Sequence, residues 1–104
     1  MNDDILRDAI KTFGKRHQAN MAVGEIGELL ALFGREVQGR TTRDEWIDEI
    51  ADITVMSRQL ALMIGIEEVE DRVEFKIKRL QEKIEEEKKS QKFKNFVDKK
   101  NIIF

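Results

Sequence analysis

The 104-residue chain contains no proline, and its β-branched residues are not clustered. Proline interrupts helices and β-branched residues favour strands, so this sequence lacks the usual signals against helix. Leu, Ile, Glu, Lys and Arg dominate the sequence, and most of these are good helix formers. We therefore predict an all-α fold.

Apolar residues that recur about every 3.6 positions divide the chain into helical segments. Gly14 and Gly65 follow the first and third segments, as is typical of helix C-termini. Thr42 and Glu45 have the spacing of a capping box at the start of the third segment. The expected helices span about residues 3–12, 15–37 and 43–64, and a fourth starts near residue 67.

The apolar positions within the helices predict which faces are buried. We expect Phe33 and Trp46 to be core residues, residues 1–90 to form one domain, and residues 91–104 to form a C-terminal extension packed on the core or on a partner subunit. Within residues 15–37 the expected core row is Ala22, Ile26, Leu29, Leu30, Phe33 and Val37. In the last helix, one apolar stripe is formed by Val69, Val73, Ile77, Leu80 and Ile84. We expect this helix or the C-terminal extension to contribute to a subunit interface.

Charge and composition argue against several classes of partner. The net charge of −2 gives no support for nucleic acid as a ligand, and the absence of cysteine removes disulfides and thiol chemistry. No apolar run approaches the roughly 18 residues that a transmembrane helix needs. The N-terminal sequence MNDDILRD lacks the charge pattern and apolar core of a signal peptide. We therefore expect a cytoplasmic protein that binds neither membranes nor nucleic acid.

Two pairs of acidic residues stand within otherwise apolar helical stretches. Glu25 and Glu28 lie three residues apart, and Glu49 and Asp52 repeat that spacing in the next helix. Residues at this spacing share a helix face. In an antiparallel hairpin, the residue numbers of two facing residues add up to the same total at every level. Glu28 with Glu49 gives the same total as Glu25 with Asp52, so the two pairs should face each other across the hairpin. The four carboxylates are therefore expected to meet at two adjacent levels of one helix pair.

Four ionised carboxylates in a partly apolar site need protons or cations to neutralise them, because a buried, uncompensated charge is very unfavourable. An all-oxygen site without His or Cys favours Mg²⁺, with Mn²⁺ as the alternative cation. Mg²⁺ commonly bridges carboxylates and substrate phosphates, so a di- or triphosphate is the expected ligand. The simpler alternative is that both acidic pairs form ordinary surface ion pairs.

Three further residues are candidates for substrate binding. Lys76 and Arg79 belong to a basic flank of the last helix and are expected to hold phosphate oxygens. Gln18 shares a helix face with Glu25, two turns earlier, and is a candidate contact to a nucleobase. The alternative for the basic flank is a solvated helix face with intrahelical ion pairs. His17, the only histidine, is expected to be structural or exposed.

The stretch FGKRHQANMAVGEIGELLALFGREVQGR, followed by DEIADITVMSRQL and FKIKRLQEKI, resembles the MazG-like all-α nucleoside triphosphate pyrophosphohydrolases, in particular their phage- and prophage-type members. The similarity covers about residues 12–84 and includes E-x-x-E, followed some twenty residues later by E-x-x-D. It implies a fold of the four-helix-bundle type and assembly as a homodimer or homotetramer. It also implies Mg²⁺-dependent cleavage of an NTP or dNTP to NMP and pyrophosphate.

The resemblance also implies roles for individual residues. Lys76 and Arg79 would contact phosphate. In the hydrolysis mechanism that we expect for the site, either Glu28 or Glu49 acts as the general base that activates water. The metal ligands would be Glu25, Glu28, Glu49 and Asp52.

One position departs from the family pattern. The family often has an additional acid immediately before the first motif, and this chain has Gly24 there, whereas the second motif keeps its extra acid, Asp48. A catalytically degenerate member that binds nucleotide or protein is therefore an alternative function. A helical interaction module without metal binding is a third.

Overall fold

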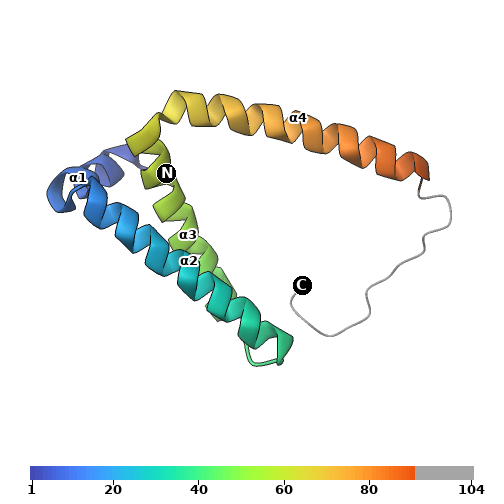
Figure 1. Cartoon of the computed structure of the whole chain (residues 1–104), viewed down its shortest axis with the longest axis horizontal. Helices are drawn as coiled ribbons and strands as arrows, with labels where there is room; N and C mark the ends of the chain where they lie inside the picture. Colours follow the sequence, from blue (N-terminus) through green and yellow to red (C-terminus); the bar gives the residue numbers. More distant parts are fainter. Residues whose placement is uncertain (91–104) are drawn as a thin grey trace. The chain divides into compact units, whose positions relative to one another are not determined.

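The computed structural model describes residues 1–90, which contain four helices and no strand. They are α1 (Asp3–Phe13), α2 (Lys15–Val37), α3 (Arg43–Ile64) and α4 (Ile66–Ser90) (Figure 1). The all-α prediction is confirmed for this part of the chain. The extension predicted for residues 91–104 lies outside the described residues.

The described residues divide into two compact units, which are considered separately. The first comprises residues 1–64, with α1, α2 and α3, and the second contains α4. That residues 1–90 act as one domain stays a prediction. No helix in the described part of the chain is both long and apolar enough to cross a membrane.

Local signals set the helix boundaries, and the predicted boundaries agree with the structure to within one residue. The Asn2 side chain accepts a hydrogen bond of 3.0 Å from the backbone N–H of Asp4, which caps α1. Gly14 ends α1 with a φ of +94°. Glycine suits this position because a residue with a Cβ would be strained in that conformation. The capping box of α3 is also present, since the Thr42 and Glu45 side chains each accept a hydrogen bond from the other residue's backbone N–H.

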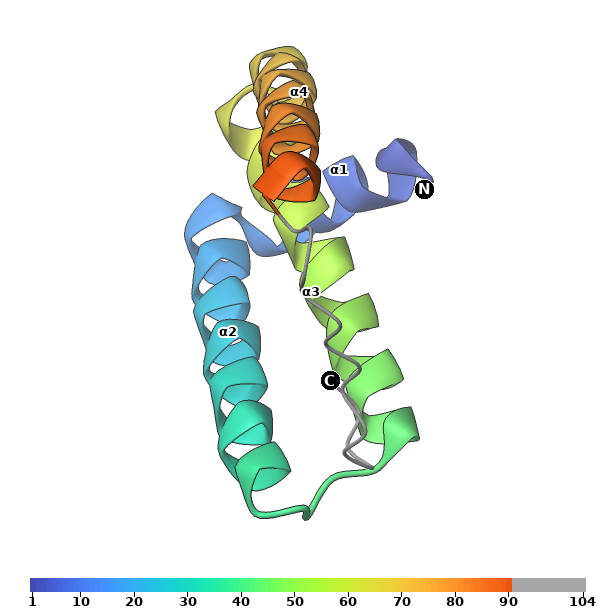
Figure 2. The ribbon, with the colours of Figure 1, turned by 90° about the vertical axis from the view of Figure 1, so that its right-hand side faces the viewer.

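Helices α2 and α3 form an antiparallel hairpin, and α1 contacts both helices (Figure 2). Gly39, with a φ of +68°, allows the short turn between them. The indole N–H of Trp46 donates to a carboxylate oxygen of Glu36 at 3.1 Å, which joins the two helices near this turn. At the other end of the unit, the Arg58 guanidinium pairs with Asp3 at 2.8 Å and holds α1 against α3.

The core of this unit is small. Only five apolar residues are buried in the described chain, and they come from all three helices of the first unit: Leu6, Ala22, Leu32, Trp46 and Ala61. Two polar residues, Gln18 and Gln59, are buried with them and bond to each other at 2.8 Å. A core of this size supplies limited stability on its own.

The predicted core row of α2 is wrong at four of its six positions. Ala22 is buried and Leu29 is half-buried, but Leu30 is 66% exposed and Val37 is 89% exposed. Ile26 and Phe33 are about half exposed. The row that faces α3 is instead Gln18, Ala22, Glu25, Leu29, Leu32 and Glu36. At about 100° per residue, this row lies roughly a quarter turn away from Ile26 and Phe33.

Several large apolar side chains of α2 and α3 are exposed. On one side of the hairpin, the Phe33 ring of α2 meets the edge of the Trp46 indole of α3, with centroids 4.7 Å apart. Trp46 is only 3% exposed, which confirms it as a core residue. We call this side the apolar face and define it by Ile26, Leu30, Phe33, Val37, Ile47 and Ile50.

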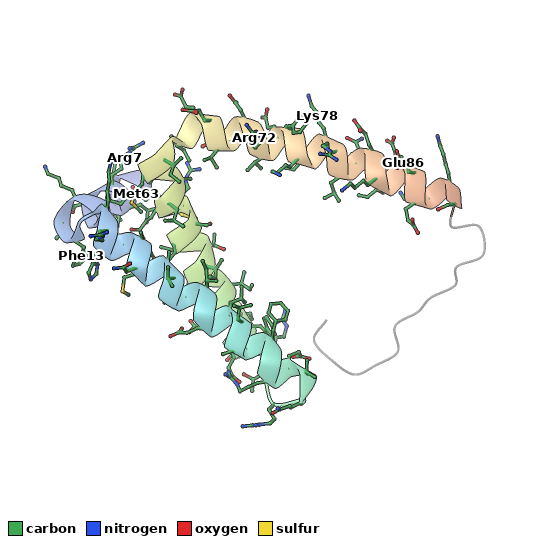
Figure 3. All side chains as sticks on the ribbon, viewed as in Figure 1. Arg7, Phe13, Met63, Arg72, Lys78 and Glu86 are labelled. Carbon is green, nitrogen blue, oxygen red and sulfur yellow. The ribbon has the colours of Figure 1, made fainter. Side chains whose placement is uncertain are left out.

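Helix α4 is amphipathic, as predicted, but its apolar row is not a buried one. Val69 is half-buried, whereas Val73, Ile77, Leu80 and Ile84 are between 45% and 58% exposed. Most of its remaining side chains are charged, as the labelled Arg72, Lys78 and Glu86 illustrate (Figure 3), but Phe75 is also 55% exposed.

Candidate metal centre

Three of the four predicted carboxylates meet between α2 and α3. Glu25, Glu49 and Asp52 each offer one oxygen, and these three oxygens lie within 4.8 Å of one another. We call these three residues the carboxylate cluster. The residue numbers of Glu25 and Asp52 add up to the total expected for one level of the hairpin, and Glu49 lies one turn from Asp52 on α3.

Glu28 stands beside this cluster without being one of the three. Its side chain is exposed, and it lies one turn after Glu25 on α2. Its negative charge contributes to raising the pKa of both Glu25 and Glu49. Glu28 is therefore an electrostatic neighbour of the cluster with an accessible carboxylate.

Two oxygens of the cluster are buried without a hydrogen-bond partner. They are Oε2 of Glu25 and Oε1 of Glu49. A buried carboxylate oxygen without a partner is unfavourable, because it loses hydration without gaining a compensating interaction. The geometry therefore calls for a bound proton or cation at this point.

Burial and mutual repulsion of the carboxylates also change the pKa values of the cluster. Burial, followed by the charges of Asp52, Glu28 and Glu49, raises the pKa of Glu25 from an ordinary 4.5 to about 7. Burial also raises the pKa of Glu49, although a hydrogen bond with Glu25 opposes that rise. The hydrogen bond between the two residues favours a proton on Glu25 that is donated to Glu49. A cation bound among the three carboxylates would relieve the same repulsion.

A hollow of about 240 Å³ opens next to the cluster and shares Glu49 with it. We call it the acidic hollow, because four of its seven lining residues are acids. The lining consists of Glu28, Ala31, Leu32, Arg35, Glu45, Asp48 and Glu49. It is large enough for several water molecules or a phosphate group.

The acidic hollow contains an ion pair that the sequence does not predict, although Arg35, with Lys15 and Arg16, is the alternative phosphate contact if Lys76 does not bind phosphate. The Arg35 guanidinium donates to Glu45 at 2.8 Å, and this ion pair links α2 to α3 across the hollow. A usable signal was present in the sequence, because Arg35 follows Glu28 by two helical turns and so occupies nearly the same side of α2.

Gln18, the candidate nucleobase contact, is 6% exposed and already has partners. Its amide donates to Gln59 at 2.8 Å, and its oxygen lies 2.8 Å from Nδ1 of His17. The His17 ring is exposed and stacks on Phe13, with centroids 5.5 Å apart. The bond to Gln59 connects α2 to α3, and the role of Gln18 towards a substrate stays a prediction.

Lys76 and Arg79 are exposed residues of α4, in the second unit. Their predicted contact with phosphate oxygens beside the carboxylates stays a prediction.

No known protein family matches this chain, and neither curated proteins nor solved structures show significant similarity to it. The resemblance to MazG-like enzymes therefore rests on the sequence motifs. The class that fold and site define together is an all-α protein with a carboxylate cluster suited to a cation.

The cluster fits a hard divalent cation by its donor set. All three donors are carboxylate oxygens, and Mg²⁺ and Mn²⁺ prefer oxygen ligands. Two of the three residues contribute a buried oxygen that has no other partner. Asp52 is exposed, which leaves one side of the cluster open to water or to a ligand.

Proposed function

We propose that the protein is a Mg²⁺-dependent nucleoside triphosphate pyrophosphohydrolase, which cleaves an NTP or dNTP to NMP and pyrophosphate. The observation that carries the metal part of this proposal is the carboxylate cluster with its two buried, unpartnered oxygens. The sequence motifs that resemble MazG-like enzymes support the choice of substrate and reaction.

Mg²⁺ would be held by Glu25, Glu49 and Asp52, with Mn²⁺ as an effective substitute. When bound, such a cation supplies charge neutralisation and lowers the pKa of a coordinated water. The three carboxylates would hold the cation between α2 and α3, which the Trp46–Glu36 hydrogen bond joins near the turn.

Glu28 is the better placed of the two predicted general bases. Its carboxylate is exposed, it lines the acidic hollow, and it is not one of the three clustered ligands. It can therefore accept a proton from a water in the hollow while Glu49 remains a ligand. This assignment predicts that Glu28→Gln lowers turnover while metal binding is largely kept.

The proposed activity is tested by incubating the purified chain with Mg²⁺ and a panel of NTPs and dNTPs, with pyrophosphate release as the readout. Glu49→Gln should abolish release, and Glu86→Gln, an exposed acid of α4, should leave it unchanged. Absence of pyrophosphate from every nucleotide with the wild-type protein would contradict the proposal.

A second candidate is nucleotide binding without turnover, and Gly24 is the observation that favours it. A Cβ at Gly24 would meet nothing within 4 Å, so the structure has room for the acid that the family pattern places there. If the missing carboxylate limits catalysis, Gly24→Glu should raise pyrophosphate release. A wild-type protein that binds nucleotide without cleaving it would favour this second function.

We also propose that the chain assembles as a homodimer or homotetramer through the apolar face. Leu30 is 66% and Ile47 52% exposed on this side of the hairpin, and exposed apolar side chains that adjoin one another mark interaction surfaces. The carboxylates point between the helices and into the acidic hollow, so covering the apolar face need not block them. Sedimentation of the purified chain at micromolar concentration tests the assembly.

A further inference from the structure

We propose that Arg35 binds phosphate oxygens of the ligand in the acidic hollow. This inference rests on the proposed function and assigns the phosphate-binding position to a residue of the hairpin itself. The first candidates from the sequence, Lys76 and Arg79, belong to α4.

The position of Arg35 on α2 directs it towards the cluster. It follows Glu28 by seven residues, which is two turns or about 10 Å along the helix. Long side chains on a helix lean towards its N-terminus, so Arg35 extends over Ala31 in the direction of Glu28. Ala31 is small and leaves the path open, and all three residues line the hollow.

A chain of hydrogen bonds holds the Arg35 guanidinium in place. Its Nη2 donates to Oε2 of Glu45 at 2.8 Å. The other oxygen of Glu45 accepts from the backbone N–H and the hydroxyl of Thr42, at 3.0 and 3.1 Å. Because Glu45 is fixed by the capping box of α3, Arg35 is fixed as well. The bond to Glu45 uses one of the five N–H donors of the guanidinium, so a fork of donors remains for an anion.

A phosphate group in the acidic hollow needs a cation beside it. Arg35 is the one cationic side chain among the described residues that line the hollow, against four acids. A phosphate group would be repelled by those acids unless cations stood between them. The planar guanidinium pairs with phosphate through two parallel hydrogen bonds, a geometry that an ammonium cannot reproduce. The Arg35 side chain is 40% exposed, so a ligand in solution can reach it.

The alternative is that the Arg35–Glu45 pair serves only to join α2 to α3. An exposed ion pair of this kind adds little stability. The two roles differ in what a substitution changes: a purely structural pair leaves phosphate affinity intact, whereas a binding residue changes it without changing metal binding.

The test is calorimetric titration of inorganic pyrophosphate into the full chain with saturating Mg²⁺. Pyrophosphate is the expected product and has no base, so the unknown base preference does not matter. Arg35→Gln should weaken binding by about 10- to 100-fold, the loss expected for charge-assisted hydrogen bonds. Arg35→Lys should weaken it several-fold, because it keeps the charge and loses the fork. Arg40→Gln, an exposed arginine that bonds to Gln38, should bind like the wild type.

A second readout separates this inference from the proposed function. The Mg²⁺-induced rise in melting temperature should be the same in wild type and in Arg35→Gln, because Arg35 is not a metal ligand. Unchanged pyrophosphate affinity in both Arg35 variants, with a normal Mg²⁺ response, would overturn the Arg35 assignment alone. A wild-type chain that responds neither to Mg²⁺ nor to pyrophosphate would overturn both. If Arg35→Gln fails to fold, Arg35→Lys decides, because it can keep the pairing with Glu45.

Discussion

The charge balance of the carboxylate cluster should make stability depend on pH in an unusual direction. The pKa of Glu25 is raised from 4.5 to about 7, so between these values the native state keeps a proton that the unfolded chain has released. A native state that binds more protons loses stability as the pH rises. Without metal, the free energy of unfolding should therefore fall between pH 5 and pH 8.

The size of this effect follows from the same pKa difference. The full difference would correspond to roughly 3 kcal/mol, and partial exposure of Glu25 reduces it to about 1–2 kcal/mol. The lowered pKa values of Asp3 and Glu45 act in the opposite direction, but their stabilising effect is lost only at more acidic pH. The range from pH 5 to pH 8 therefore reports mainly on the cluster.

The assay is urea unfolding followed by far-UV circular dichroism at pH 5, 6, 7 and 8, with and without Mg²⁺. Glu25→Gln should flatten the profile, because the glutamine cannot titrate, and Glu86→Gln on α4 should leave it as in the wild type. Mg²⁺ should restore stability at pH 8 and have little effect at pH 5, where protons compete for the same oxygens. A metal-free stability that rises from pH 5 to pH 8, or an equal slope in Glu25→Gln, would refute this reasoning.

Three further predictions test other parts of the structure. Leu30→Glu on the apolar face should shift the sedimenting species towards monomer with unchanged helix content. Ile5→Glu, at a comparably exposed position of α1, should sediment like the wild type. Equal masses for the wild type and both variants would place the interface elsewhere. Trp46→Phe should lower the free energy of unfolding by about 1–2 kcal/mol, because it removes the indole N–H that joins α3 to Glu36, and urea unfolding measures this loss. Lys76→Ala should lower turnover by about 10²–10³-fold if α4 supplies a phosphate contact, with a smaller effect of Arg79→Ala that acts mainly on KM; normal kinetics in Lys76→Ala would leave phosphate binding to the hairpin.

Most of the helical architecture could be predicted from the sequence because the signals that set it are local. Gly14, Gly65 and the Thr42–Glu45 capping box act within one turn of the chain, and each marks a boundary in the structure. The approach of Glu25 to Asp52 could also be predicted, since a short turn fixes which levels of two antiparallel helices adjoin.

The buried side of α2 could not be predicted because the helix carries apolar residues on two sides. Ile26 and Phe33 continue one row, and Leu29 and Leu32 continue another that also contains Glu25. Hydrophobicity alone favours the first row, and the packing of α2 on α3 selects the second. This choice of side turns Glu25, Glu28 and Arg35 towards α3, with Glu25 in the cluster and Glu28 and Arg35 in the lining of the acidic hollow.

Titration with Mn²⁺, followed by electron paramagnetic resonance, measures whether the carboxylate cluster binds a divalent cation. The signal of free aqueous Mn²⁺ diminishes as the ion binds, so the method counts sites without requiring turnover. Mn²⁺ should bind saturably to the wild type at pH 8, and Mg²⁺ should displace it. Binding should be lost in Glu49→Gln and Asp52→Asn and kept in Glu86→Gln. A free Mn²⁺ signal that stays undiminished with the wild-type protein, or binding that survives in both cluster variants, would contradict this prediction.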